Sequence, residues 1–257
     1  MARRFGKLAE RALHRRSLRR WERAQERAEK DDLHELRKLR TRARELRRRL
    51  EKVLHIADGR LTLPLIGSNA IERPLHSDWA WRPELWRGPL SPPGMAAVET
   101  KAQIGDEVRL FHDCTISELT LRQVRNTRTE DLAPFGLRLD VFRFDGSFLS
   151  LVIDLPPEAV QGLLRRHLVR MTMVVELEQP LEMFARLNIR HGPNNEQLVR
   201  ELQIIDGQVE VDFDLAYSNM NEKRLERAWV DLIFEGPQLN QITLRDVTFS
   251  RRPRAEL

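Results

Sequence analysis

Two runs of residues decide how this chain folds: Ala185-Arg-Leu-Asn-Ile-Arg190 and Val209-Glu-Val-Asp-Phe-Asp-Leu215. In both runs apolar and polar residues alternate with a period of two, which is typical of a strand with one face in a core and the other exposed. Trp229–Phe234 is the expected partner of these strands. None of the three runs contains a catalytic motif, so the sequence predicts an architecture before it predicts a reaction.

Residues 106–257 form a succession of short apolar runs separated by turn residues, as in an all-β domain. The pairs Asp145-Gly146 and Asp206-Gly207 predict tight hairpins. One helix is expected at Pro157–His167, because proline favours the first turn of a helix. This pattern favours an antiparallel β-sandwich of the jelly-roll kind over a parallel α/β sheet. The expected strands are Glu107–Phe111, Ser117–Val124, Leu137–Phe144, Phe148–Leu155, Arg170–Leu177, Phe184–Arg190, Leu198–Ile204, Gln208–Leu215, Ala228–Glu235 and Gln241–Arg251.

Residues 1–54 form a basic segment that is rich in helix-forming residues. The segment has 20 Lys and Arg against 9 Asp and Glu, whereas the whole chain has 44 and 39. From Leu36 to Val53 the apolar residues are three and four apart, which is a heptad seam, and Asp31-Asp32 is the expected helix boundary. We therefore predict self-association through residues 36–53 as a coiled coil, or a helical hairpin with residues 5–28.

The arginines of this segment support a second interpretation. A dense basic face attracts phosphate backbones or anionic lipid head groups through long-range electrostatics. No basic-zipper signature is present, so nucleic-acid binding would be non-specific, and the apolar face is too small for a stable membrane anchor. The basic surface consists of Arg15, Arg16, Arg19, Arg20, Arg23 and Arg27.

Residues 55–105 lose the helical period and contain a proline or a glycine every few residues. They also contain Trp79, Trp81 and Trp86, although disordered segments are usually poor in aromatic residues. We predict an extended connector that packs on the body and buries its indole rings. The alternative is an aromatic surface for sugar rings or for a proline-rich partner.

Composition argues against several classes of function. The single cysteine, Cys114, allows no intrachain disulfide, which fits a reducing compartment and a cytoplasmic location. No run approaches the ~18 apolar residues of a membrane-spanning helix, and the first eight residues do not resemble a secretion signal. The histidines lack metal-ligand spacing, and no phosphate-binding loop or nucleophile elbow occurs. The sequence therefore favours a non-enzymatic protein without a cofactor.

Four segments carry a resemblance to known proteins: Phe184–Asn194, Phe213–Tyr217, Ala228–Phe234 and Ile242–Phe249. Together they resemble a domain family of unknown function from cytoplasmic proteins of alphaproteobacteria, over most of the chain. The final strand is also similar to the galactose-binding-like jelly rolls of carbohydrate-binding modules. That second resemblance covers the C-terminal part of the chain and implies a β-sandwich and glycan binding.

The outward faces of the alternating strands are the predicted binding surface. We first expect their arginines and carboxylates to form a cross-strand ladder. The second interpretation is a groove in which these side chains bind sugar hydroxyls while an aromatic ring stacks on the sugar. The third is a Ca²⁺ site, which has suitable oxygen ligands but not the spacing of an EF-hand. The ligand-binding candidates are Arg186, Asn188, Arg190, Asp212, Asp214, Tyr217 and Trp229, and the calcium candidates are Asp212, Asp214, Asn219, Asn221 and Glu222.

Two functional hypotheses follow from these patterns. The first is a non-enzymatic cytoplasmic recognition or scaffold protein, with a β-sandwich body that is oligomerised by its N-terminal helix. The second is a carbohydrate-binding module or, with paired carboxylates in a cleft, a carbohydrate-active enzyme.

Overall fold

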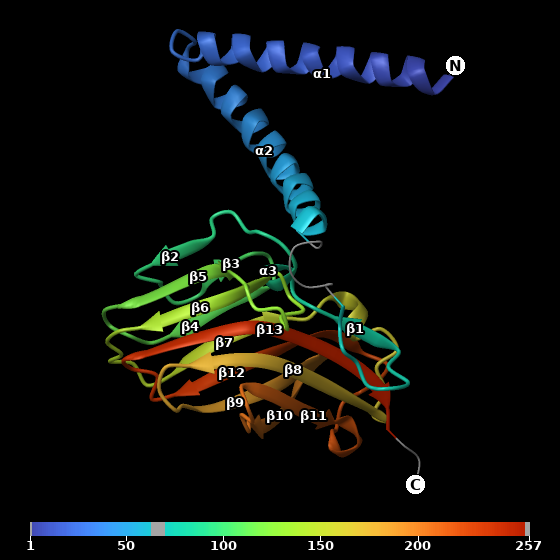
Figure 1. Ribbon diagram of the computed structural model, residues 1–257, viewed down its shortest axis with the longest axis vertical. Coiled ribbons are helices and arrows are strands. Elements are labelled where there is room, and N and C mark those ends of the chain that lie inside the picture. Colours follow the sequence, from blue (N-terminus) through green and yellow to red (C-terminus); the bar gives the residue numbers. More distant parts are fainter. Residues whose placement is uncertain (1, 63–69, 255–257) are drawn as a thin grey trace. The chain divides into compact units, whose positions relative to one another are not determined.

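The protein divides into two compact units, Met1–Leu54 and His55–Leu257, in a computed structural model that describes residues 2–62 and 70–254 (Figure 1). The helices are α1 (Ala2–Arg27), α2 (Leu33–Thr62) and α3 (Glu84–Arg87), with 3-10 turns η1 (Pro157–Ala159) and η2 (Leu215–Tyr217). The first strands are β1 (Trp79–Trp81), β2 (Gly94–Ala96), β3 (Ala102–Ile104), β4 (Val108–His112), β5 (Leu119–Arg125), β6 (Phe135–Val141) and β7 (Leu149–Asp154). The remaining strands are β8 (His167–Leu177), β9 (Glu182–His191), β10 (Asn194–Glu201), β11 (Gln208–Asp214), β12 (Leu225–Glu235) and β13 (Asn240–Pro253).

Asp32 sets the beginning of α2. Its Oδ1 accepts hydrogen bonds from His34 N at 2.8 Å and Glu35 N at 3.0 Å, so the carboxylate satisfies two free N–H groups of the first turn. The helix passes the expected boundary at residue 54 and ends at Thr62. No proline interrupts this stretch, and the single Gly59 weakens a helix by only about 1 kcal/mol.

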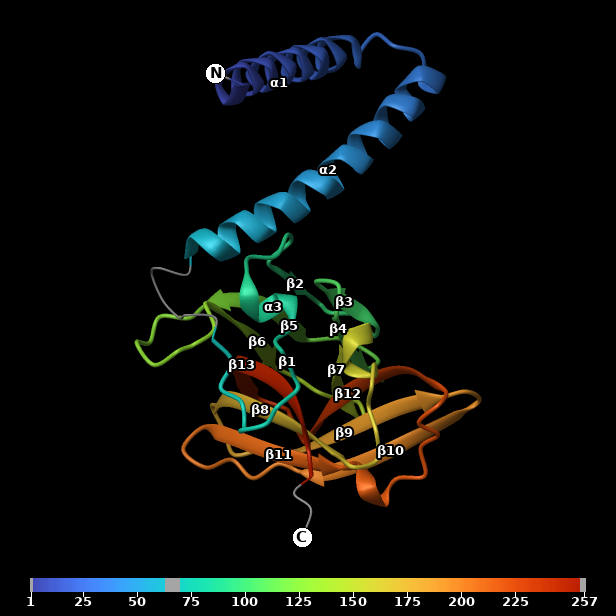
Figure 2. The same cartoon turned by 90° about the vertical axis from the view of Figure 1, so that its right-hand side faces the viewer.

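In the described residues two antiparallel sheets lie face to face (Figure 2). One has the strand order β11-β8-β13-β6-β5-β2, with β1 paired to β13, and the other has the order β10-β9-β12-β7-β4-β3. We call them the seven-stranded and the six-stranded sheet. Each strand from β4 to β13 overlaps one of the ten predicted strands, so the predicted antiparallel sandwich is confirmed. No helix among these residues is long and apolar enough to cross a membrane.

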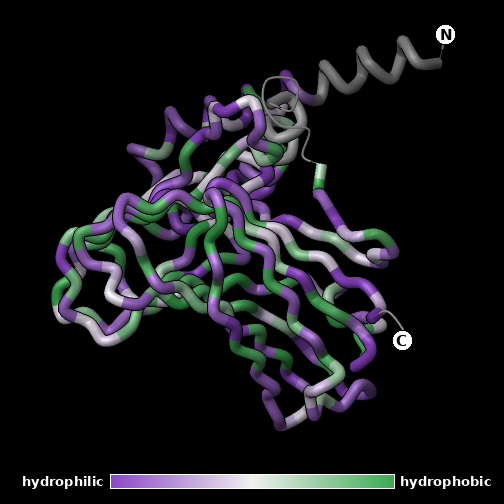
Figure 3. The backbone as a smooth tube through the Cα atoms, turned by 60° about the horizontal axis from the view of Figure 1, so that its bottom comes forward, coloured by the Kyte–Doolittle hydropathy of each residue, from purple (hydrophilic) through white to green (hydrophobic). Residues whose placement is uncertain are grey.

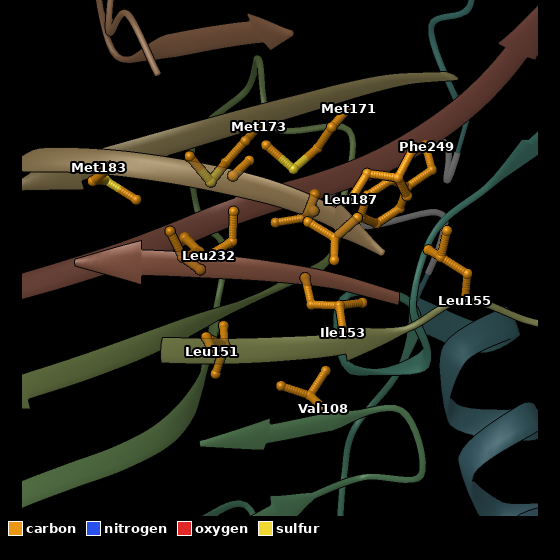
Figure 4. Packing of buried hydrophobic residues seen from close by; sticks show 14 of the residues in the cluster. Val108, Leu151, Ile153, Leu155, Met171, Met173, Met183, Leu187, Leu232 and Phe249 are labelled. Carbon is orange, nitrogen blue, oxygen red and sulfur yellow. The ribbon is translucent and has the colours of Figure 1, made fainter. Parts of the chain in front are cut away.

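The core lies between the two sheets and follows from the alternation of residues along each strand (Figure 3). Met171 and Met173 of β8 point from the seven-stranded sheet toward Leu187 of β9 and Leu232 of β12 (Figure 4). All four side chains are almost completely buried. Burial of a side chain of this size contributes about 1.5–3 kcal/mol, so the inward residues of both sheets hold the sandwich together.

The two runs that define the fold lie in different sheets. β9 pairs with β10 and β12, as expected for Trp229–Phe234, whereas β11 pairs with β8. The predicted ladder between the arginines of β9 and the carboxylates of β11 is therefore wrong. Alternation assigns each residue to a face of its strand, but it does not say which strands pair.

The first predicted hairpin is also wrong, because β6 and β7 on either side of Asp145-Gly146 belong to different sheets. Asp113 holds the connection instead, since its Oδ1 accepts a hydrogen bond from Ser147 N at 2.7 Å. Asp206-Gly207 does form a tight turn, with φ values of 52° and 75°. Two successive residues with positive φ are typical of a type I′ turn. Here the turn joins Ile205 and Gln208, which form a single antiparallel bridge.

The helix predicted at Pro157–His167 is wrong as well. Only Pro157–Ala159 forms a single 3-10 turn, and Gly162 leaves the helical region with φ of 69°. Ala159 and Leu163 are buried in the core, so packing rather than helical hydrogen bonding fixes this connection.

A β-bulge in β13 receives hydrogen bonds from two distant segments. The register of β13 against β8 shifts between Leu244 and Asp246, which removes backbone groups from the ladder. Trp86 Nε1 donates to Leu244 O at 2.9 Å, and Asn126 Nδ2 donates to Arg245 O at 2.8 Å. Trp86 is completely buried. The indole and the amide thus replace the donors that the bulge has lost.

Arg82 forms a second attachment to the bulge. Its Nε lies 2.8 Å from Asp246 Oδ1 and its Nη2 lies 2.7 Å from Asp246 Oδ2, and the arginine is only 2% exposed. Burial raises the pKa of the Asp246 carboxyl above its ordinary value, and the hydrogen bonds and charge of Arg82 oppose that rise. Arg82 also donates to Ala70 O at 2.9 Å, so it connects the tryptophan-rich segment to β13.

The carboxylates of β11 are paired with arginines of their own sheet. Arg170 of β8 donates from Nε and Nη2 to Asp212, both at 2.8 Å, and from Nη1 to Glu210 at 2.7 Å. Arg252 of β13 reaches Asp212 Oδ2 at 3.2 Å. The hydrogen bonds from Arg170 hold the pKa of Asp212 below its ordinary value, although burial acts to raise it. The carboxylates therefore form a ladder, but with Arg170 and Arg252.

Replacement of Trp86 by Phe tests the importance of the hydrogen bond to the bulge. The variant leaves Leu244 O buried without its donor, so we expect the free energy of unfolding to fall by about 1–3 kcal/mol in urea titrations followed by circular dichroism. Trp81→Phe is the matched control, because the Trp81 indole N–H makes no hydrogen bond within the described residues. Equal losses in the two variants would contradict this account.

Asp212→Asn tests the ladder on β11. The folded pKa of Asp212 is below the unfolded value of 3.8, so its carboxylate stabilises the fold above about pH 4 and loses this effect as pH falls through the folded pKa. We expect the variant to be about 1 kcal/mol less stable than the wild type at pH 7, with a smaller difference at pH 3. Asp206→Asn is the control, because it makes the same change at a turn where asparagine accepts the positive φ. A pH-independent loss would argue against the ion pair.

Candidate functional site

A groove of about 580 Å³ lies on the outward face of the six-stranded sheet. This volume falls within the ordinary range of small-ligand sites, about 300–1,000 Å³. We call it the sheet groove, because its lining comes from the adjacent strands β9, β12, β7 and β4 together with Phe148 just before β7. The lining residues are Arg109, Phe111, Phe148, Ser150, Val152, Asp154, Arg186, Arg227, Trp229, Asp231 and Ile233.

Strand pairing arranges these residues in rows across the sheet. Neighbouring strands are about 4.8 Å apart, and successive outward residues on one strand are about 7 Å apart. The regular register of the six-stranded sheet therefore fixes which side chains meet in the groove. The cross-strand pairs are Trp229 with Asp154, Asp231 with Arg186 and with Val152, Ile233 with Ser150, Arg109 with Val152, and Phe111 with Ser150.

A buried carboxylate, Asp231, lies at the centre of the groove and is only 4% exposed. Its Oδ2 accepts hydrogen bonds from Arg186 Nε at 2.8 Å and from Asn188 Nδ2 at 3.0 Å, and Arg186 Nη2 lies 2.7 Å away. Gln197 in turn donates to Asn188 Oδ1 at 2.9 Å. All donors from the described residues reach Oδ2, so Oδ1 keeps its capacity to accept a hydrogen bond from a ligand. This network fixes the position of the Arg186 guanidinium.

Two buried polar atoms in the groove have no hydrogen-bond partner among the described residues. They are Ser150 Oγ and Arg109 Nε, and the Ser150 residue is only 8% exposed. Arg109 Nη2 does bind Asp154 Oδ2, so only one side of this guanidinium is occupied. A buried polar atom without a partner costs about 1–3 kcal/mol. An oxygen-rich ligand in the groove would remove this cost.

Aromatic side chains complete the lining. Phe148 is 45% exposed, and Phe111 and Trp229 are half-buried. The Arg227 guanidinium lies over the Trp229 ring, 4.8 Å from its centroid, as a cation–π contact. The groove thus offers flat apolar surfaces beside fixed hydrogen-bonding groups, a combination that is typical of sites for small organic ligands.

The predicted ligand-binding residues fall into two groups. Arg186 and Trp229 line the groove, and Asn188, the cross-strand neighbour of Trp229, donates a hydrogen bond to Asp231 of the lining. Arg190 lies on the same strand as Arg186 but forms an ion pair with Glu226, Nε to Oε2 at 3.0 Å, outside the lining.

The other three candidates are not brought to the groove. Asp212 and Asp214 belong to the seven-stranded sheet, and Asp214 accepts a hydrogen bond from Ala216 N and lies 3.5 Å from Arg254. Tyr217 is 77% exposed on η2, where it contacts the Arg254 guanidinium. These residues therefore do not form one site with Arg186 and Trp229.

Four of the five calcium candidates are engaged with protein groups through their side chains, and among the described residues Asn219 makes a polar contact only through its backbone N–H, which donates to Glu196 Oε1 at 3.1 Å. Asp212 and Asp214 meet arginines, Asn221 accepts from Lys223 N at 3.1 Å, and Glu222 accepts from Arg165 N at 2.6 Å. Across the described ranges, no group of three or more His, Cys, Asp or Glu residues is placed to hold a metal ion. Asp212, Asp214 and Glu222 therefore do not gather into a cluster of acidic groups in the described part of the chain. On α1, the six arginines of the predicted basic surface are exposed, and an anionic partner for them stays a prediction.

Sequence reasoning missed most of the groove. The missed residues are Arg109, Phe111, Phe148, Ser150, Val152, Asp154, Arg227, Asp231 and Ile233. Period-two alternation does mark Arg109 and Phe111, because both alternate with buried residues along β4. No comparable signal marks Ser150, which lies within an uninterrupted apolar run.

Solved structures of several β-sandwich proteins are similar to this chain. The family 11 carbohydrate-binding module from Clostridium thermocellum has 8% sequence identity and a TM-score of 0.39, covering 63% of this chain and 97% of its own. The CBM22-1 xylan-binding domain from Paenibacillus barcinonensis Xyn10C has 9% identity and a TM-score of 0.34, covering 63% and 94%. The chain spans only 19% of a third similar structure, the enzymatically active domain of bacteriophage CBA120 tailspike protein 4, with 7% identity, a TM-score of 0.38 and 56% of this chain covered.

Sequence comparisons give a more definite result. No curated protein sequence matches the chain significantly. The profile of one family, described as a family of unknown function (DUF6478), matches residues 1–257, which confirms the resemblance to a family of this kind. The protein therefore belongs to the family of unknown function DUF6478.

Proposed function

We propose that this protein is a carbohydrate-binding module whose ligand occupies the sheet groove. The observation that carries the proposal is the placement of two buried, unpartnered polar atoms beside aromatic rings. Ser150 Oγ and Arg109 Nε lack partners among the described residues, and both residues line the groove that Trp229 also lines. A ligand that supplies oxygen atoms and an apolar ring face together would satisfy both features.

Sugars have this combination of groups. Each hydroxyl both donates and accepts hydrogen bonds, so it can bind a carboxylate oxygen and an arginine N–H at the same time. The groove supplies such acceptors on Asp154 and Asp231 and such donors on Arg109 and Arg186. Its aromatic side chains can pack against the C–H face of a sugar ring. Because four strands hold these groups, the site is formed before the ligand arrives, which lowers the entropic cost of binding.

The two carboxylates of the groove are arranged for binding rather than for hydrolysis. A glycoside hydrolase uses one carboxyl group that carries a proton and a second that is ionised. Here Asp154 accepts a hydrogen bond from Arg109, and Asp231 accepts one from Arg186. Both carboxylates therefore serve to orient an arginine, and we assign neither a proton-donor role.

Trp229→Ala is the direct test of the proposed site. We expect the wild-type protein to bind a subset of an array of immobilised oligosaccharides, namely β-glucans, xylans, galactans and their acidic derivatives. Loss of an aromatic contact of about 1–3 kcal/mol should weaken this binding by about fivefold to 150-fold, measured by titration calorimetry.

Tyr217→Ala provides the matched control. Tyr217 is the most exposed aromatic residue of the predicted set and lies outside the groove, so its removal should leave the affinity unchanged. Binding that survives Trp229→Ala but is lost in Tyr217→Ala would move the site away from the six-stranded sheet. A wild-type protein that binds no member of the array would contradict the proposed function.

Self-association through α2 is a second proposed function, and it is favoured by the exposure of the heptad seam. Leu50 is 52% and Val53 is 62% exposed in the single chain, while Leu36, Leu39 and Leu46 are only partly buried. Apolar residues on one face of a helix are stabilised when a second helix covers them. Paired helices would present two sandwich units together and raise their avidity for a polymeric ligand. The single cysteine is compatible with a cytoplasmic setting for such a scaffold.

Leu39→Asn with Leu46→Asn tests this pairing in the full-length chain. We expect the wild type to be a dimer or a higher oligomer in multi-angle light scattering at micromolar concentration, and the double variant to be a monomer, because the seam then buries two amides. Arg42→Asn with Arg49→Asn is the control, since it places the same side chains outside the seam. A monomeric wild type would refute the coiled coil without affecting the sheet groove.

A further inference from the structure

The charges of the sheet groove are not balanced. Its lining contains three arginines and two aspartates. Arg186 is paired with Asp231, and Arg109 is paired with Asp154. Each of these carboxylates is therefore matched by one guanidinium, and one positive charge in the groove remains.

The remaining charge belongs to Arg227. Within the described residues its guanidinium has no carboxylate partner, and its one recorded contact is with the Trp229 ring. Its cross-strand neighbour on β9 is another cation, Arg190, which is itself paired with Glu226. Contact with an aromatic face leaves the in-plane N–H groups of a guanidinium available, and these groups match a carboxylate or sulfate in a bidentate geometry.

We infer that the ligand of the sheet groove is an acidic glycan, which carries carboxylate or sulfate groups, and that Arg227 binds its anionic group. This inference rests on the proposed function and specifies the chemical class of the ligand. Arg227 supplies the charge, while Asp231 Oδ1, Ser150 Oγ and Arg109 Nε supply hydrogen bonds to the uncharged oxygens of the sugar.

The spacing of these groups indicates an oligosaccharide rather than a single sugar. Arg227 and Ile233 are six residues apart on β12, and Ser150 is the cross-strand neighbour of Ile233. At about 3.4 Å per residue, the backbone of Arg227 is about 20 Å from that of Ile233, and Trp229, over which the Arg227 guanidinium lies, is about 14 Å from it. One sugar ring cannot bridge either distance, so the anionic group and the hydroxyls that bind at the far end belong to different residues of one chain.

The acidic composition of the second unit does not prevent such binding. Residues 55–257 contain 24 Lys and Arg against 30 Asp and Glu, so their overall field repels anions. At physiological ionic strength charges are screened over about 8 Å, so the nearest groups dominate. Within the groove the nearest groups are the paired arginines and the unpaired Arg227, and the local balance is positive.

The test compares matched pairs of glycans on the full-length protein. Each acidic oligosaccharide is paired with its neutral counterpart: C6-carboxylated with unmodified cello-oligosaccharides, glucuronate-bearing with plain xylo-oligosaccharides, and sulfated with plain galactans. We expect at least a tenfold preference for the acidic member of one pair, decreasing with added salt. Arg227→Gln should reduce the affinity for that acidic glycan to the level of its neutral counterpart.

Arg200→Gln is the charge-matched control, because Arg200 is exposed on β10 and donates only to Val199 O in the described structure. It should leave the preference unchanged, and an equal effect of both substitutions would overturn the inference by indicating non-specific attraction. Equal binding of acidic and neutral members, with loss of both in Trp229→Ala, would overturn the inference and leave the proposed function standing. If no glycan binds, both fall.

Discussion

The register shift in β13 is the constraint on which the rest of the second unit depends. A bulge in a central strand leaves carbonyl groups in a dry interior, where each unpaired group costs about 1–3 kcal/mol. Here Trp86 and Asn126 supply the missing donors from far along the chain. Gly136 is required beside them, because a Cβ at this position would lie only 2.9 Å from Leu244 O. The bulge is therefore stabilised by the tryptophan-rich segment and by Asn126, which follows β5, and it needs a glycine at position 136 of β6.

The six-stranded sheet contrasts with this arrangement. From β9 to β4 its register is regular across the strands that line the groove, with one shift near Leu225 at the beginning of β12. Regular pairing brings outward residues into straight rows, so Asp231 meets Arg186 on one side and Val152 on the other. The seven-stranded sheet, through its bulge, thus anchors the tryptophan-rich segment. The six-stranded sheet, which is regular across the groove, presents a fixed set of side chains on its outward face.

The sequence predicts the strands of this fold better than their partners. Period-two alternation identifies β9 and β11 correctly, because buried and more exposed residues alternate along both strands. Alternation does not indicate the sheet to which a strand belongs. For this reason Asp145-Gly146 is predicted to be a hairpin turn, whereas it connects a strand of one sheet to a strand of the other. The groove was found only in part for the same reason. Arg186 and Trp229 stand out on their own strands, whereas Arg109 and Asp154 meet across 45 positions of the chain.

The sheet groove combines aromatic side chains with buried polar atoms that lack partners in the described part of the chain, in one hollow of the six-stranded sheet. The carboxylates on β11 of the seven-stranded sheet are matched by arginines, as Asp212 is by Arg170 and Arg252, but that sheet also contains buried atoms without a hydrogen-bond partner within the described ranges, such as Arg138 Nε and Arg245 Nε. On the six-stranded sheet Ser150 Oγ and Arg109 Nε stay buried without partners among the described residues. A ligand oxygen in the groove would give the Ser150 hydroxyl the hydrogen-bond partner that the described residues do not supply.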